Sequence, residues 1–167
     1  ENMFFPNAKN PEIYDLSINE VGGLDIQLLG IGFNGHIGFN EPIDEHEISY
    51  KDFKALPTRT VKLDKLTLQT NARLTADNKL EMMPSEAVTL GMSSILGSKK
   101  IILLACFNEQ AYPLKKIKTG KITLEVPATF LLEHNDTEII YTEDTILLWT
   151  KTNENFNKKC SYYFTRC

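Results

Sequence analysis

One short loop brings together the residue types that acid–base chemistry needs. The segment GIGFNGHIGFNEP, residues 30–42, holds four of the chain's nine glycines, and the imidazole of His36, the carboxamide of Asn34 and the carboxylate of Glu41 lie among them. Histidine exchanges protons near neutral pH, and a neighbouring carboxylate influences its charge. Glycines let backbone amides approach a ligand closely. The loop therefore predicts acid–base catalysis on an anionic metabolite.

The same loop also matches the fingerprint of a dinucleotide-binding turn, because Gly30, Gly32 and Gly35 satisfy G-x-G-x-x-G. That motif requires the glycines to open a helix, with an acidic residue about twenty positions further on at the end of a second strand. Here the loop continues to Pro42 and a polar segment follows, so a nucleotide site is disfavoured. A purely structural loop, in which the histidine is an ordinary satisfied side chain, is the alternative.

A metal site is the third interpretation. His36, Glu41 and His46 carry suitable ligand atoms, but their spacings match no common zinc pattern. We therefore do not expect a metal site here. His46 and His134 have no distinguishing context and are expected to be surface residues.

Composition limits the classes of protein to consider. The 167 residues, 42% of them hydrophobic, suffice for one domain with a real core, so residues 1–167 are expected to form a single domain. A net charge of −4 and a pI of about 5.4 argue against nucleic acid or an anionic membrane as a partner. Three widely spaced cysteines indicate a reduced, cytoplasmic chain. Cys106 ends an apolar run and is expected to be a small core residue rather than a catalytic thiol.

The elements that position the loop can be read from the apolar pattern. Two continuous apolar runs, residues 24–30 and 100–106, predict strands buried on both faces of a parallel sheet, with residues 58–63 as a strand beside the first. The other expected elements are helices at 64–74 (starting at Asp64), 108–120 and 127–134, and late strands at 137–142 and 145–150. The helix predicted at 108–120 is expected to tolerate or be kinked by Pro113 and to end at Gly120.

Strands that alternate with helical stretches predict an α/β fold with a largely parallel sheet. Ligands of such sheets bind beyond the carboxyl ends of the strands, which is where the glycine loop follows the first apolar run.

Residues 1–23 are mixed and polar. Residues 151–167 show no period, and this uncertain tail is a docked arm, a frayed end or not native.

Several motifs resemble one enzyme family. LGIGFNGHIGFNEP (29–42) resembles the signature loop of glucosamine-6-phosphate deaminases, and the resemblance continues through TNAR (70–73) and residues 84–105 to about residue 145. The related 6-phosphogluconolactonases carry a G-x-D-G-H-T loop without the F-N-E-P ending. The resemblance implies a three-layer, Rossmann-like parallel sheet with flanking helices. It also implies conversion of glucosamine 6-phosphate to fructose 6-phosphate and ammonia without metal or cofactor.

The resemblance assigns roles within the loop. In the family the histidine, His36 here, shuttles a proton to open the pyranose ring, and the carboxylate, Glu41 here, hydrogen-bonds the imidazole and sets its charge. The position two residues before the histidine is Asp in some members and Asn in others, and this chain has Asn34. Loop amides from Gly30 through Gly32 and Gly35 are expected to hold substrate oxygens.

The phosphate end of the site departs from the family pattern. Arg73 of TNAR resembles the family's phosphate-binding arginine, whose planar fork suits a phosphate. Gln110 aligns with a family lysine, so the charge of that lysine is lost, at a cost of about 1–3 kcal/mol in phosphate affinity. Arg59 matches one basic residue of an allosteric site, but Val61 replaces a second, so allostery is not expected.

The family's Rossmann-like first half, with the aspartate that removes the C2 proton, would precede residue 1. Asp15 and Asp25 are the nearest candidates, and neither has the family's surrounding motif. We therefore expect the C-terminal part of a deaminase that forms a homo-oligomer or binds a partner N-terminal half. A catalytically impaired sugar-phosphate-binding or subunit-interaction protein of the same fold is the alternative.

Overall fold

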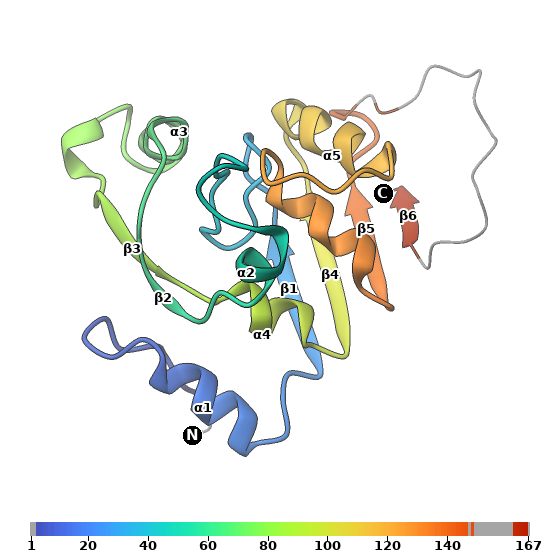
Figure 1. The fold of residues 1–167 in the computed structure, drawn as a ribbon. Coiled ribbons are helices and arrows are strands. Elements are labelled where there is room, and N and C mark those ends of the chain that lie inside the picture. Colours follow the sequence, from blue (N-terminus) through green and yellow to red (C-terminus); the bar gives the residue numbers. More distant parts are fainter. Residues whose placement is uncertain (1–2, 147, 149–161, 167) are drawn as a thin grey trace.

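The fold is built on a four-stranded parallel sheet (Figure 1). The computed structural model describes residues 3–146 and 148, together with the backbone of 162–166. The strands β1 (Ile26–Gly30), β4 (Lys100–Ala105), β5 (Thr137–Tyr141) and β6 (Tyr162–Arg166) lie in the order β1-β4-β5-β6, and each neighbouring pair is parallel. The predicted parallel α/β fold is confirmed. Both apolar runs form strands, but the predicted burial of the first run on both faces is wrong, because one face of β1 is exposed.

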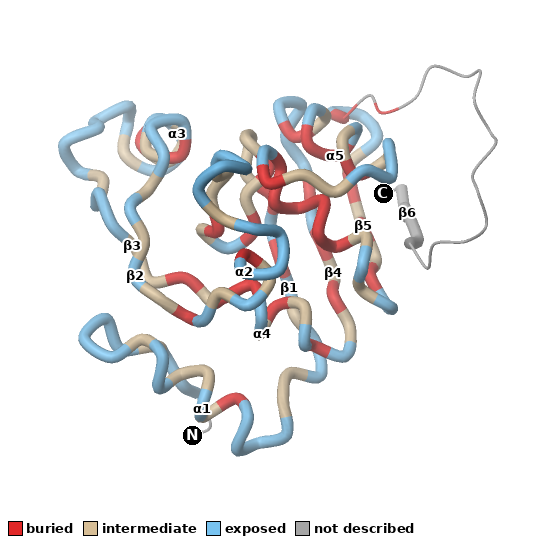
Figure 2. The backbone as a smooth tube through the Cα atoms, in the orientation of Figure 1, coloured by how far each residue is buried: buried red, intermediate tan, exposed pale blue. Residues whose placement is uncertain are grey.

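One face of this sheet carries the hydrophobic core. Leu29, Leu103 and Ile139 are in register across three strands and are buried, as Figure 2 shows for the centre of the molecule. The helix α5 (Ala111–Lys118) and the 3-10 helix η3 (Pro127–Glu133) pack on each other, and Leu114 and Phe130 from them join the same core. Since side chains alternate across a strand, the neighbouring residues must point to the opposite face.

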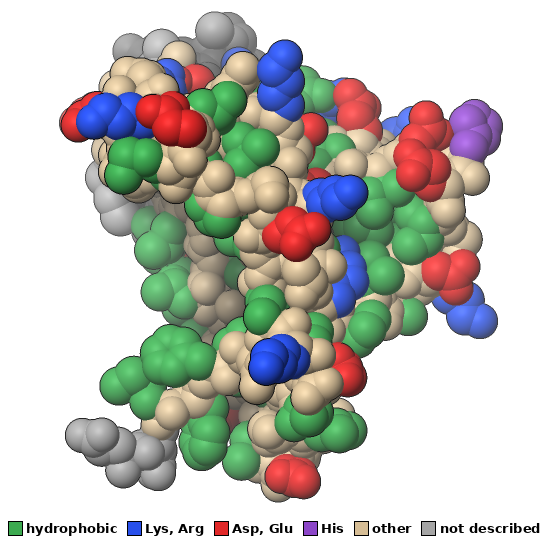
Figure 3. Space-filling model, turned by 90° about the vertical axis from the view of Figure 1, so that its left-hand side faces the viewer, with side chains coloured by type: hydrophobic (Ala, Val, Ile, Leu, Met, Phe, Trp, Pro, Cys, Tyr) green, Lys and Arg blue, Asp and Glu red, His purple; other side chains and the backbone are tan. Residues whose placement is uncertain are grey.

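That opposite face is apolar but exposed. Ile26 and Leu28 of β1 are each 60% exposed and Leu104 of β4 is 42% exposed, although a core strand normally buries such residues. Among the described residues β1 pairs only with β4, so its outer edge has no partner. Further exposed apolar side chains gather over α1 (Ile13–Glu20) and the residues before it, at the bottom of Figure 3.

The strand predicted at 58–63 forms, but its predicted place beside the first strand is wrong. β2 (Arg59–Lys62) pairs antiparallel with β3 (Glu86–Thr89) in a separate two-stranded ribbon, visible to one side of the sheet in Figure 1. Its residues alternate between exposed and half-buried. That alternation is typical of a ribbon with one wet face, whereas a strand inside a parallel sheet is apolar on both sides.

The predicted helices lie close to their expected positions. α3 (Lys65–Thr75) begins after Asp64, whose carboxylate accepts a hydrogen bond from Leu66 N–H. Segment 108–120 forms η2 (Asn108–Gln110) followed by α5, which ends before Gly120 at a φ of +74°. Pro113 lies in the first turn of α5, where no intrahelical N–H bond is lost, so it causes no kink. The helix predicted at 127–134 is the 3-10 helix η3, with Pro127 at its start.

The sequence did not predict several short helices, because they are too short to show a recurring apolar pattern. These are α1, α2 (Tyr50–Lys54), α4 (Met92–Leu96) and the 3-10 helix η1 (Leu80–Met82). The tail contributes β6. Of the strand predicted at 145–150, residues 147, 149 and 150 lie outside the described residues, and residues 145, 146 and 148 are not in a strand. No helix in the described part of the chain is both long and apolar enough to cross a membrane.

Candidate active site

The glycine loop forms the wall of a pocket at the carboxyl end of β1. The pocket has a volume of about 440 Å³. It is bounded by residues 27–30 of β1, by the loop, by α3, by Leu90 and Ile95, and by residues that follow β4. His36 lines it, with Phe33 and Phe39 from the loop and Phe107 from beyond β4. The predicted position of a ligand site at the strand ends is thus matched by a cavity of suitable size for a small molecule.

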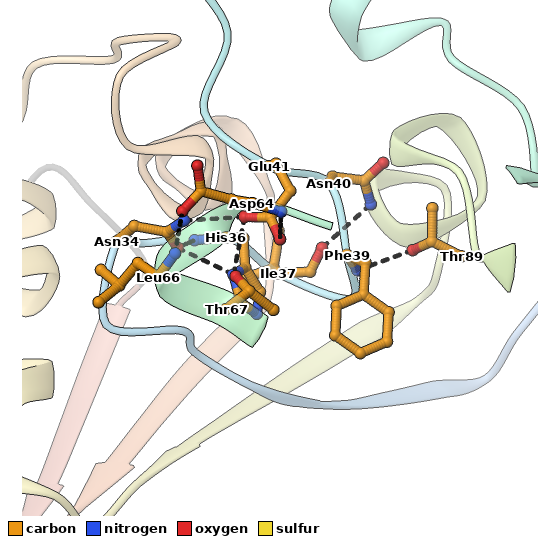
Figure 4. A network of polar contacts seen from close by, with 10 residues as sticks. All are labelled: Asn34, His36, Ile37, Phe39, Asn40, Glu41, Asp64, Leu66, Thr67 and Thr89. Carbon is orange, nitrogen blue, oxygen red and sulfur yellow. Dashed lines mark hydrogen bonds and ion pairs between the residues drawn. The ribbon is translucent and has the colours of Figure 1, made fainter. Parts of the chain in front are cut away.

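Three side chains of the loop form one hydrogen-bonded cluster (Figure 4). His36 Nδ1 lies 2.8 Å from Asn34 Oδ1 and 3.1 Å from Glu41 Oε2, and Asn34 Nδ2 donates to Glu41 Oε2 at 2.8 Å. Asn34 Oδ1 also accepts the backbone N–H of His36. The cluster predicted from the sequence is therefore assembled within one loop.

This geometry fixes the tautomer of the imidazole. An amide oxygen can only accept, so Nδ1 of His36 must carry the hydrogen that points to Asn34. In the neutral ring Nε2 then holds the lone pair, and Nε2 makes no hydrogen bond within the described residues. Nε2 is consequently the nitrogen that can exchange a proton with a ligand in the pocket.

Glu41 is ionised in this environment. Burial alone would raise the pKa of its carboxyl, but hydrogen bonds from His36, Asn34 and Thr67 and the charge of His36 together hold the pKa below its ordinary value of 4.5. The His36 and Glu41 side chains are 13% and 12% exposed. A carboxylate this close to Nδ1 stabilises the imidazolium that forms when Nε2 takes up a proton.

Packing constrains three of the four loop glycines, and Gly32 and Gly35 are the most crowded of them. A Cβ at Gly32 would lie 2.3 Å from Cε1 of His36, so the imidazole rests against bare backbone. Gly35 has a φ of +89°, and a Cβ there would lie 2.5 Å from Val126. Gly30 has neither constraint, since nothing lies within 4 Å of its Cβ position. Gly30 and Gly32 line the pocket, whereas the backbone of Gly35 turns the loop.

Asn40 anchors the far end of the loop. It is fully buried, its Nδ2 donates to the carbonyls of Ile37 and Leu90, and its Oδ1 accepts a hydrogen bond from Arg59 Nη1 at 2.8 Å. Burial lowers the pKa of the Arg59 guanidinium. Arg59, considered from the sequence as an allosteric residue, is thus placed as a partner of the loop anchor.

The two predicted phosphate-site residues already have partners. Arg73 Nη2 donates to Glu109 Oε1 at 2.8 Å, and its guanidinium lies 5.5 Å from the Phe33 ring centroid at the pocket rim. Gln110 lines the pocket, but its Oε1 accepts from the N–H groups of Cys106 and Phe107, and its Nε2 donates to Ile31 O. Gln110 therefore joins the ends of β1 and β4, with one amide hydrogen left for a ligand.

The two aspartates considered as the base that removes the C2 proton lie away from the pocket. Asp15 on α1 accepts hydrogen bonds from Thr58 and Ser94, which tie that helix to the rest of the fold. Asp25 precedes β1, at the opposite end of the strand from the loop, and pairs with Lys99. Neither aspartate lines the pocket.

Several minor expectations need correction. Cys106 is exposed rather than a core residue, because the chain turns outward directly after β4. His46 is exposed as expected, but His134 is half-buried: its Nε2 donates to Ser98 O and its Nδ1 contacts Thr137 Oγ1. The described residues contain no group of three or more His, Cys, Asp or Glu placed to hold a metal.

The sequence did not predict one residue that contacts this cluster, Thr67. The hydroxyl of Thr67, in the first turn of α3, lies 3.3 Å from His36 Nδ1, and the backbone N–H of Asp64 donates to Glu41 Oε1 at 3.3 Å (Figure 4). The available signal in the sequence is a threonine three residues after Asp64, the predicted start of the helix. That signal is weak, because the same spacing serves ordinary helix packing.

Comparison with known proteins identifies the chain's relatives. Glucosamine-6-phosphate deaminase of Clostridium perfringens is 39% identical over 153 residues, covering 88% of this chain and 59% of the relative. The enzyme of the same name from Clostridium acetobutylicum is 46% identical over 127 residues, covering 76% and 48%. No protein-family model matches. The chain thus spans less than two thirds of the length of these curated relatives.

Solved structures agree on the fold. A monomeric glucosamine-6-phosphate deaminase superposes with a TM-score of 0.66 at 36% identity, covering 77% of this chain and 49% of that one. A 6-phosphogluconolactonase from Trypanosoma cruzi superposes with a TM-score of 0.58 at 20% identity, covering 82% and 50%, which shows a shared fold only. Over the part that these comparisons cover, the chain is similar to glucosamine-6-phosphate deaminases in sequence and in fold.

Proposed function

We propose that the protein to which this chain belongs deaminates glucosamine 6-phosphate to fructose 6-phosphate and ammonia, and that this chain supplies the acid–base group that opens the sugar ring. The observation that carries the proposal is the orientation of His36. Asn34 and Glu41 hold its Nδ1, so its Nε2 is left for the ligand in the pocket. The name of the relatives supports the choice of substrate.

Ring opening needs one group that first accepts and then donates a proton. His36 Nε2 removes the proton from the anomeric hydroxyl O1, the bond between C1 and the ring oxygen breaks as the C1–O1 double bond forms, and the imidazolium returns the proton to the former ring oxygen. Glu41 stabilises the cationic intermediate state of His36, and Asn34 keeps the ring oriented.

The later steps need a second base. Isomerisation moves a proton from C2 to C1 through an enolamine and leaves an imine at C2. Water then adds to C2, and loss of ammonia leaves the C2 ketone of fructose 6-phosphate. Asp15 and Asp25 are held in contacts away from the pocket. The base for C2 is therefore proposed to come from outside the described residues, and the activity of the whole protein depends on it.

The phosphate is proposed to bind at the rim formed by Arg73 and Phe33. A phosphate there has to replace the Glu109 carboxylate as the partner of the guanidinium. Loop amides near Gly30 and Gly32 are proposed to contact sugar oxygens, since both residues line the pocket.

The decisive experiment replaces His36 by Gln in the complete protein and measures ammonia release from glucosamine 6-phosphate. Turnover is expected to fall by about 10²–10⁴, the usual contribution of a positioned acid–base group. His46→Gln, at an exposed histidine that does not line the pocket, is the matched control and should keep its turnover. Equal turnover in both variants would remove His36 from the mechanism.

A second function has one observation in its favour. Among the described residues, the side chains that line the pocket include no lysine or arginine, and the neighbouring Arg73 is already paired with Glu109. This suits a sugar-phosphate-binding or subunit-interaction protein with impaired catalysis. Binding of glucosamine 6-phosphate without ammonia release by the complete protein would favour that function over deamination.

A further inference from the structure

Within the described residues, Thr67 supplies the one buried hydroxyl in contact with His36 of the His36–Glu41 pair. Its side chain is 4% exposed, it comes from the first turn of α3 rather than from the glycine loop, and its Oγ1 lies 3.3 Å from His36 Nδ1 (Figure 4). The same hydroxyl contributes to lowering the pKa of the Glu41 carboxyl. The Thr67 hydroxyl thus joins a second element of the fold to the acid–base pair of the loop.

The hydrogens in this cluster can be assigned by counting. His36 Nδ1 has a single hydrogen, and its shortest contact, at 2.8 Å, is to Asn34 Oδ1. The Thr67 hydroxyl also has a single hydrogen, and the ionised carboxylate of Glu41 is its strongest acceptor. The lone pairs of Thr67 Oγ1 then face Nδ1. The hydroxyl thus supports the carboxylate and offers the N–H group a further acceptor.

The residue that precedes α3 also binds the Glu41 carboxylate. The backbone N–H of Asp64 donates to Glu41 Oε1 at 3.3 Å. The charged groups beside this contact on α3 are Asp64, whose own carboxylate caps the helix through Leu66 N–H, and the exposed Lys65. From the loop side the titratable neighbour is His36. α3 therefore fixes where the negative charge stands relative to the imidazole.

We infer that Thr67 is a positioning residue for the proposed ring-opening step: its hydroxyl holds ionised Glu41 against His36 Nδ1. The inference rests on the proposed function for its kinetic consequence, but not for its structural one. Without the hydroxyl, the ionised form of Glu41 loses a hydrogen bond, and the imidazolium formed at Nε2 loses part of its stabilisation.

Two substitutions separate this role from packing. Thr67→Val keeps the branched shape and removes the hydroxyl, whereas Thr67→Ser keeps the hydroxyl and removes a methyl group. In the complete protein Thr67→Val is expected to lower kcat about 10- to 100-fold, the effect of losing a hydrogen bond to a charged group, with KM nearly unchanged. Thr67→Ser should recover most of kcat. Thr75→Val, at an exposed hydroxyl in the last turn of the same helix, is the control.

The pH profile gives a second signature. Removing a hydrogen bond from a carboxylate raises its pKa, so the acid limb of the kcat profile should move to higher pH in Thr67→Val and stay in place in Thr67→Ser. The pKa of the Glu41 carboxyl, followed by carbon NMR in the complete protein, should rise in Thr67→Val by the same amount. Should the valine variant fail to fold, Thr67→Ala replaces it with the same expectations.

The outcomes distinguish this inference from the proposed function. A rise in the Glu41 pKa confined to variants that lack the hydroxyl, in a protein that releases no ammonia, supports the position of Thr67 and defeats the deaminase proposal. An active enzyme in which Val and Ser at position 67 have equal kcat, or in which the Glu41 pKa does not respond, overturns the role of Thr67.

Discussion

The imidazole of His36 packs directly against the backbone of Gly32: a Cβ at residue 32 would lie 2.3 Å from Cε1, 2.4 Å from Nδ1 and 2.6 Å from Nε2. No real side chain tolerates such contacts, so any residue other than glycine must displace the ring. Gly32 is thereby tied to the chemistry of the loop through space as well as through the backbone.

Gly32→Ala is therefore expected to turn His36 away from Asn34 and Glu41. The overpacked site should cost about 1–3 kcal/mol in the free energy of unfolding, measured by urea denaturation. The nitrogen NMR signals of His36 should lose the signature of a protonated Nδ1. Gly30→Ala is the control for stability, because nothing lies near its Cβ position, and should leave the stability within about 1 kcal/mol of the original. An unchanged His36 spectrum in Gly32→Ala would contradict the packing argument.

Stability should also depend on pH through Glu41. Its pKa is lowered in the fold, so its ionised form favours the folded state above the ordinary pKa of 4.5, and that contribution is lost as the pH falls through the folded value. Glu41→Gln should be about 1–3 kcal/mol less stable than the original chain at pH 7, and the difference should shrink below pH 4.5. Urea unfolding at a series of pH values measures this. A difference that is independent of pH would show that Glu41 is not ionised in the cluster.

Local sequence was sufficient for the parts of the structure that local forces decide. β1 and β4 follow from continuous apolar runs, α3 from the cap at Asp64, and the cluster of Asn34, His36 and Glu41 from residues that share one loop. Residues that lie within seven positions of each other in one loop can contact each other without help from the rest of the fold.

Long-range partners were not predictable in the same way. The pairing of β2 with β3 rather than with β1, the neutralisation of Arg73 by Glu109, and the approach of Thr67 to His36 each join residues more than twenty positions apart. A side chain such as Gln110 also has several possible partners, and only the fold shows that it binds backbone groups of three residues. Tertiary packing determines these contacts, and no hydrophobic pattern or motif in the sequence indicates them.

The pair formed by Arg73 and Glu109 predicts an effect on anion binding. Both side chains are nearly half exposed, so their attraction is worth about 0.2–1 kcal/mol, and a phosphate at Arg73 has to overcome it. Glu109→Gln should therefore tighten the binding of inorganic phosphate up to about fivefold, and less at high salt. Glu133→Gln breaks a similarly exposed pair with Lys54 and is the matched control. Equal phosphate affinity in both variants would place the anion away from Arg73.

The exposed apolar face of the sheet predicts self-association of this chain when it is produced alone. Ile26, Leu28 and Leu104 present adjacent apolar side chains, and the free edge of β1 lies beside them. Covering such a face with a second copy removes apolar area from water at about 25 cal/mol per Å², and an unpaired strand edge adds hydrogen-bonding groups that can pair.

Analytical ultracentrifugation at micromolar concentration should therefore detect dimers or larger species. Introducing charge into the face with the double change Leu28→Lys and Leu104→Lys should shift the distribution towards the monomer, because the buried lysines would have no partner. Leu80→Lys, at a leucine on η1 that is 47% exposed and lies off the sheet, should leave the association unchanged. A monodisperse monomer of the unaltered chain, or equal association of the two lysine variants, would show that this face does not mediate contacts between copies.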